Sequence, residues 1–104
     1  MKGVLTIIPA SGAVSSKKLA APPALEDLQG GVGGYIELVP GFNHWQGERC
    51  VAFCDEDGKR KKLPYNMRAT KRWYDQMQGP FIRKDVLVGP IVIVTGDREL
   101  MEEL

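Results

Sequence analysis

Short apolar segments of strand length, most of them closed by proline or glycine, constrain the fold of this chain more than any other feature. The segments that we expect to be strands are Val4–Ile8, Tyr35–Val39, Glu48–Cys54, Lys59–Leu63 and Val86–Val94. The fourth is inferred from Asp57-Gly58, because Asp-Gly is the strongest short hairpin signal and should return the chain beside the third segment. Gly89-Pro90 interrupts the last one, so a bulge, a sheet edge or a strand start is expected there.

A first short helix is predicted over Pro22–Gln29. Proline is tolerated in a first helical turn, and Glu26 and Asp27 favour the helix dipole near its N-terminus. Glycines should end this helix and turn the chain, with a positive φ at one of the last two. The glycines concerned are Gly30, Gly31, Gly33 and Gly34.

A second helix is predicted over Met67–Met77, with Asn66 as its N-cap and Gly79-Pro80 as its end. A stripe at helical spacing should face the core, and consists of Met67, Thr70, Trp73, Tyr74 and Met77. Ala10–Lys18 is small and polar, which is typical of a loop. The acidic tail Asp97–Leu104 is a further helix candidate.

These elements predict one α+β domain over residues 1–104: a small, mostly antiparallel sheet of four to five strands with two short helices packed on it. The contents of hydrophobic and charged residues, 43% and 26%, are typical of a globular protein. No apolar run approaches the roughly 20 residues that span a membrane, and Pro9 cuts short the only run that resembles a signal peptide. We therefore expect a cytoplasmic location and no membrane partner.

Neither a cofactor nor an active site is predicted. Cys50 and Cys54 should share one face of a strand about 13 Å apart, too far for a disulfide, and a metal site with His44 and Asp55 would lack a Cys-x-x-Cys pair. The glycine block follows a helix and precedes a strand, which is the reverse of a phosphate-binding loop. His44 has no sequence-evident catalytic partner, so we do not expect an enzyme.

The charge pattern is the most informative functional feature. Basic residues gather without any acid among them, and they are Lys59, Arg60, Lys61, Lys62, Arg68, Lys71 and Arg72. A basic strand next to a basic helix face could form one positive partner-binding surface for phosphate groups or acidic proteins. The basic strand and the helix face could equally be two separate solvated surfaces whose charges offset nearby acids. A secondary candidate is the loop with Phe42, His44 and Trp45, whose two aromatic residues are expected to be exposed.

Several sequence blocks occur in an order that resembles a family of small proteins encoded by phages, plasmids and bacteria, known only as a domain of unknown function. The blocks are Leu28-Gln29, Val32-Gly33-Gly34-Tyr35-Ile36-Glu37, Cys54-Asp55-Glu56-Asp57-Gly58-Lys59, Leu63-Pro64-Tyr65-Asn66 and Asp85–Ile93. The resemblance implies an α+β fold and a mobile-element setting, and it supplies no reaction. This chain departs from the pattern in its longer loop at Pro40–Gly47 and in its basic Lys59–Lys62.

The leading hypothesis is a non-enzymatic binding protein of a mobile element that inhibits a host defence complex such as CRISPR-Cas by covering part of its surface. Its partner would be a host protein or nucleoprotein complex with an acidic or phosphate surface. The alternative is an accessory or regulatory protein that binds nucleic acid through the same basic face. A small hydrolase or nucleotide binder has little support.

Overall fold

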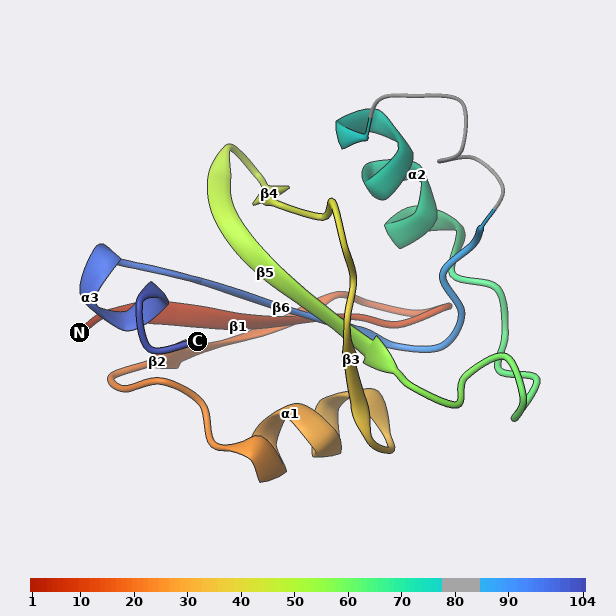
Figure 1. The fold of residues 1–104 in the computed structure, drawn as a ribbon, viewed down its shortest axis with the longest axis horizontal. Coiled ribbons are helices and arrows are strands. Elements are labelled where there is room, and N and C mark those ends of the chain that lie inside the picture. The colour runs from red at the N-terminus through yellow and green to blue at the C-terminus, as the bar shows by residue number, and fades with distance from the viewer. Residues whose placement is uncertain (78–84) are drawn as a thin grey trace.

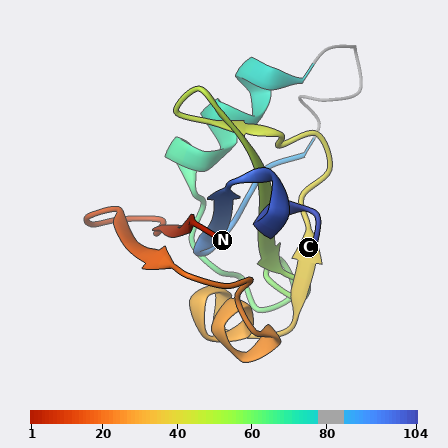
Figure 2. The same ribbon diagram turned by 90° about the vertical axis from the view of Figure 1, so that its left-hand side faces the viewer.

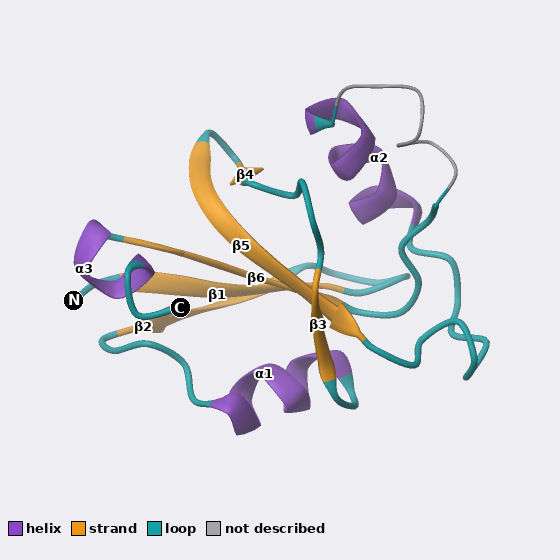
Figure 3. Cartoon of the chain, in the orientation of Figure 1, coloured by secondary structure: helices purple, strands orange, loops and turns teal. Residues whose placement is uncertain are grey.

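The computed structural model describes residues 1–77 and 85–104 and shows one sheet in which every described strand pairing is antiparallel (Figure 1, Figure 3). The strand order is β2-β1-β6-β5-β3, and β4 pairs with β5 off this path. The strands are β1 (Gly3–Ile8), β2 (Ser15–Leu19), β3 (Ile36–Leu38), β4 (His44–Trp45), β5 (Glu48–Asp55) and β6 (Ile91–Gly96). The helices are α1 (Leu25–Val32), α2 (Met67–Gln76) and α3 (Arg98–Met101). The predicted α+β class is confirmed.

The central strand β6 is covered on both faces. Ile91 and Ile93 belong to the core beneath α2, whereas Val92 and Val94 belong to the core beneath α1. All four are buried, as alternation of side chains along a strand requires when each face meets a helix. Figure 2 shows α1 and α2 on opposite sides of the sheet.

Helix α1 ends at Gly33, which adopts the left-handed conformation that terminates the helix. Gly33 has φ 83° and its N–H bonds to the carbonyl of Gln29, which confirms the predicted positive φ. Gly30 and Gly31 lie inside the helix and do not end it. A Cβ on Gly31 would stand 2.5 Å from Cγ2 of Val92, so this glycine lets α1 approach the sheet closely.

Two strand expectations are wrong. Lys59–Leu63 forms successive turns instead of a strand, because β6 and β3 already occupy both edges of β5 and leave no edge for a hairpin partner. Ser15–Leu19, within and beyond the expected loop, is the edge strand β2 on β1. It is polar and mostly exposed, so it lacks the apolar pattern by which strands are recognised.

Helix α2 begins at its predicted cap. The Asn66 side chain accepts the N–H of Ala69 at 3.1 Å, and its amide donates to the carbonyls of Ile8 and Gly89, each at 2.9 Å. The fully buried Asn66 thus ties α2 to β1 and to the start of β6. Strand β6 begins directly after Pro90, so the strand-start interpretation of Gly89-Pro90 is correct. The expected strand over Val86–Val94 is therefore wrong in its first part, where Val88 makes only an isolated bridge to Tyr65.

The stripe of α2 faces the core with one exception. Thr70 and Trp73 are buried, while Tyr74 and Met77 are partly buried and pack at the margin. Met67 is 65% exposed, because Ala69 takes the inward position of the first turn. The predicted helix end at Gly79-Pro80 lies outside the described residues.

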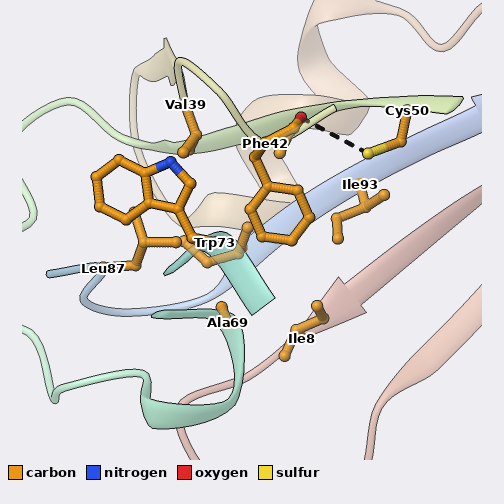
Figure 4. Close-up of a cluster of buried hydrophobic side chains, with 10 residues drawn as sticks. Ile8, Val39, Phe42, Cys50, Ala69, Trp73, Leu87 and Ile93 are labelled. Carbon is orange, nitrogen blue, oxygen red and sulfur yellow. Dashed lines mark hydrogen bonds between the residues drawn. The ribbon is translucent and has the colours of Figure 1, made fainter. Parts of the chain in front are cut away.

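The core beneath α2 contains Phe42, which was expected to be exposed in a loop (Figure 4). Phe42 is 1% exposed, so its expected exposure is wrong. It packs with Trp73, whose Nε1 donates to the carbonyl of Pro40 at 2.7 Å. Cys50 is buried in this cluster and Cys54 is partly buried, and neither forms a disulfide, as expected.

The acidic tail does contain a helix, α3, whose N-cap Asp97 accepts the N–H of Leu100 at 2.9 Å. Leu100 is buried against the face of the sheet that α1 covers. None of the described helices is long and apolar enough to cross a membrane.

Candidate binding surface on α2

Three of the four basic residues in the turns over Lys59–Lys62 form ion pairs with acids. Lys59 pairs with Asp85, Arg60 Nη2 lies 3.0 Å from Oδ2 of Asp57, and Lys61 Nζ lies 2.7 Å from Oδ2 of Asp55. Lys62, which has a positive φ of 56°, makes no ion pair with a described residue. Most of the positive charge of Lys59–Lys62 is therefore offset locally.

The pair between Asp55 and Lys61 is structural. The Asp55 side chain is 1% exposed and also accepts the N–H of Asp57 at 2.8 Å. The hydrogen bond from Lys61 lowers the pKa of Asp55 below its usual value and outweighs the opposing effect of burial. A Cβ on Gly34 would stand 2.7 Å from Nζ of Lys61, so this glycine makes room for the pair beside the end of α1.

The basic residues of α2 are placed differently. Arg68, Lys71 and Arg72 lie three and four positions apart, so they form one exposed stripe that continues to Asp75. Arg68 donates through Nη2 to the carbonyl of Pro9 at 2.5 Å, which anchors it near the β1–β2 hairpin. Within residues 1–77 and 85–104, no acid lies in ion-pair distance of Lys71 or Arg72. Their charge remains available to a partner.

A groove runs between this stripe and two neighbouring segments, and its volume is about 320 Å³. Its lining consists of Ile8, Val14, Trp45, Arg68, Lys71, Arg72 and Asp75. Trp45, from the secondary candidate loop, therefore lies in the same groove as the three predicted basic residues of α2. The other two residues of that loop line a different hollow, where His44 is exposed and Phe42 is buried. We call these lining residues the α2 groove.

The last turn of α2 holds one wall of the groove in place. Oε1 of Gln76 accepts the N–H of Asn43 at 2.8 Å and the N–H of His44 at 2.7 Å. The backbone that carries Trp45 is thus fixed to the helix that carries the basic stripe. Sequence reasoning had no signal for Gln76 or for Val14, because both depend on which loop meets the helix in space.

The seven predicted basic residues do not share one hollow. Lys59 and Arg60 line a separate cleft of about 270 Å³ between β3 and the segment Asp85–Val88, whose rim also carries Glu37. The expected adjacency relied on a strand over Lys59–Leu63, which does not form. Among the described residues, Lys62 also lacks an ion pair, but only the predicted residues on α2 line a groove together.

The match to a family model spans residues 1–103. The chain belongs to the family described as Domain of unknown function (DUF3846). The resemblance inferred from the ordered sequence blocks is thereby confirmed. Neither the curated proteins nor the solved structures give a match to this DUF3846 chain.

The thiols of this DUF3846 member are poor nucleophiles. Burial raises the pKa of Cys50 to about 12, and burial together with Glu37 raises the pKa of Cys54 to about 11. A thiol with such a pKa is almost entirely protonated at neutral pH. In the described part of the chain, no group of three His, Cys, Asp or Glu side chains could hold a metal ion.

Proposed function

We propose that this chain is a non-enzymatic binding protein of a phage or plasmid, which acts in the host cytoplasm and inhibits a defence complex such as CRISPR-Cas by covering a negatively charged part of its surface. The observation that carries the proposal is the α2 groove, where Lys71 and Arg72 are exposed without acid partners among the described residues, beside Trp45. The mobile-element setting is supported by the sequence resemblance alone.

The charge order of α2 supports a binding role. Helices favour acids in the first turn and bases in the last, each by about 0.3–1 kcal/mol. Here the first turn carries Arg68 and no acid, while Asp75 lies in the last turn, which has no base. Charges that run against the helix dipole lower helix stability, and residues that break a local rule are typical of functional sites.

Binding is favoured over catalysis by the chemistry of the available groups. Both thiols are protonated at neutral pH, and His44 is exposed and lines a different hollow from the α2 groove. Among the described residues, no group of three His, Cys, Asp or Glu side chains could hold a catalytic metal ion. A charged, aromatic groove of this kind can hold a partner without reacting with it.

The proposal can be tested in a host whose CRISPR-Cas system targets a phage. Expression of the chain should restore plaque formation, and the purified chain should bind the defence complex after nuclease treatment. Replacing Arg68, Lys71 and Arg72 by Glu should weaken this binding about a hundredfold or more, equivalent to about 2.7 kcal/mol. The thermal midpoint should change little, because a glutamate in place of Arg68 would gain from the helix dipole roughly what the lost bond to Pro9 contributed.

The matched control changes three exposed basic residues outside the groove, Lys2, Lys62 and Arg98, to Glu. It alters the net charge equally and should leave binding and plaque formation unchanged. Normal binding by the α2 variant, or equal loss in both variants, would refute a specific surface on α2.

The alternative function is nucleic-acid binding, and Trp45 favours it because an aromatic ring beside cations can stack on a base. The net charge of +1 and the presence of Asp75 in the groove count against it, since nucleic-acid-binding domains are typically strongly basic. Binding that disappears on nuclease treatment would support this alternative.

A further inference from the structure

We propose that the α2 groove binds an acidic peptide segment of the partner protein that also inserts one apolar side chain. The carboxylates would pair with Arg68, Lys71 and Arg72, and the apolar group would pack between Val14 and Trp45. This inference rests on the proposed function and adds the chemistry and the orientation of the ligand.

The apolar part of the groove is suited to a side chain. Val14 is 41% exposed just before β2, and Trp45 is partly buried with its inner side against the core. Ile8 lies buried in the same lining. An apolar ligand group placed here would leave water and cover apolar surface, which is favourable by about 25 cal/mol per Å².

The size of the groove limits the ligand. Its volume of about 320 Å³ lies at the lower end of roughly 300–1,000 Å³, the range of pockets that enclose small molecules. A groove of this size accommodates one large side chain with its neighbours on the rim. It is already formed, because Gln76 fixes the Trp45 segment to α2 and Arg68 fixes α2 to Pro9. A preformed groove lowers the ordering cost of binding.

The charge order along α2 sets the direction of the ligand. Arg68, Lys71 and Arg72 occupy the first two turns, and Asp75 closes the stripe. Carboxylates of the ligand should therefore lie over the N-terminal part of α2, where the helix dipole adds to the attraction. The region next to Asp75 should receive a neutral or basic residue.

An acidic peptide fits these features better than a nucleic acid. A phosphate backbone would meet Asp75 inside the groove, while the exposed Val14 would have no matching group on the backbone. Protein segments combine carboxylates and aliphatic side chains at short spacing, as the lining requires.

Fluorescence anisotropy with labelled synthetic peptides tests the inference. The probes are short peptides in which one Leu is flanked by Asp and Glu, the same peptides with Ser in place of Leu, and a single-stranded oligonucleotide of equal charge. The Leu peptides should bind at least about tenfold more tightly than the Ser peptides, and binding should weaken as salt is added. The inference would be overturned if neither peptide bound, if both peptides bound equally, or if the oligonucleotide bound more tightly than the peptides.

Two variants locate the apolar contact. Val14→Asp should weaken binding of the Leu peptides about tenfold or more, because it places a like charge where the apolar group packs. Ser11→Asp adds the same charge to the exposed loop of the β1–β2 hairpin outside the groove, and it should have little effect. Equal losses in the two variants would overturn the inference. If the α2 variant loses the defence complex but no peptide binds, the peptide chemistry fails and the proposed function stands.

Discussion

Replacing Lys61 by Met should destabilise the fold through one buried carboxylate. Lys61 Nζ is 2.7 Å from Asp55, whose side chain is 1% exposed, whereas the Lys61 side chain is 41% exposed. Methionine keeps an aliphatic chain of similar length and removes the charge. Asp55 would then keep the hydrogen bond from the N–H of Asp57 and lose its ion-pair partner.

The expected loss lies between two limits. Removing one partner of a buried pair costs about 3–5 kcal/mol, and exposed pairs contribute about 0.2–1 kcal/mol. Because water reaches Lys61 but not Asp55, we expect a loss between these limits, about 2 kcal/mol at neutral pH. For a domain of this size, that corresponds to a decrease of about 10 °C in the thermal midpoint.

The effect should depend on pH. The folded-state pKa of Asp55 lies below its unfolded value of about 3.9, so its contribution is present above that value and is lost as pH falls through the folded pKa. Without Lys61, the largest cause of the lowered pKa is removed while burial still opposes ionisation, so the folded pKa of Asp55 should rise above that of the parent. The stability difference between Lys61→Met and the parent should therefore shrink as pH falls from the folded pKa of the variant to the lower folded pKa of the parent, below which Asp55 is neutral in both.

Urea denaturation at neutral and acidic pH measures this difference. Lys62→Met is the matched control, because Lys62 is exposed in the same turn segment without an ion pair to a described residue, and it should change stability by less than about 0.5 kcal/mol. If Lys61→Met loses the same stability at both pH values, lost packing and not charge is responsible, and the reasoning fails.

Two further predictions concern glycines of α1, measured by thermal unfolding. Gly33→Val should cost about 1–3 kcal/mol because φ is 83°, although nothing would contact its Cβ, and Gly33→Asn should cost less because asparagine tolerates this conformation. Gly31→Ala should destabilise because its Cβ would meet Val92 at 2.5 Å, whereas Gly30→Ala has open space and should stabilise by about 0.5–1 kcal/mol. Equal effects at Gly30 and Gly31 would contradict the close approach of α1 to β6.

Local chemistry in the sequence determined the ends of elements. Asn66 caps α2 because its short side chain reaches the N–H of Ala69, and Gly33 ends α1 because only a left-handed residue closes that turn. The assignment of successive β6 residues to opposite faces of the sheet likewise follows from the strand period of two. These features involve residues within a few positions of one another, so a single sequence suffices to predict them.

The tertiary structure determined which strand edges were already paired and which charges were already neutralised. Lys59–Leu63 could not become a strand because β3 and β6, distant in sequence, occupy both edges of β5. The charge of Lys59 is offset by Asp85, which lies 26 positions away, while Lys71 and Arg72 meet no such acid among the described residues. Strand pairing and charge neutralisation depend on distances in space between residues that are far apart in the sequence. A local sequence pattern therefore cannot predict them. The sequence therefore located the positive charge of this chain, and only the fold determined which part of that charge lines a groove beside Trp45.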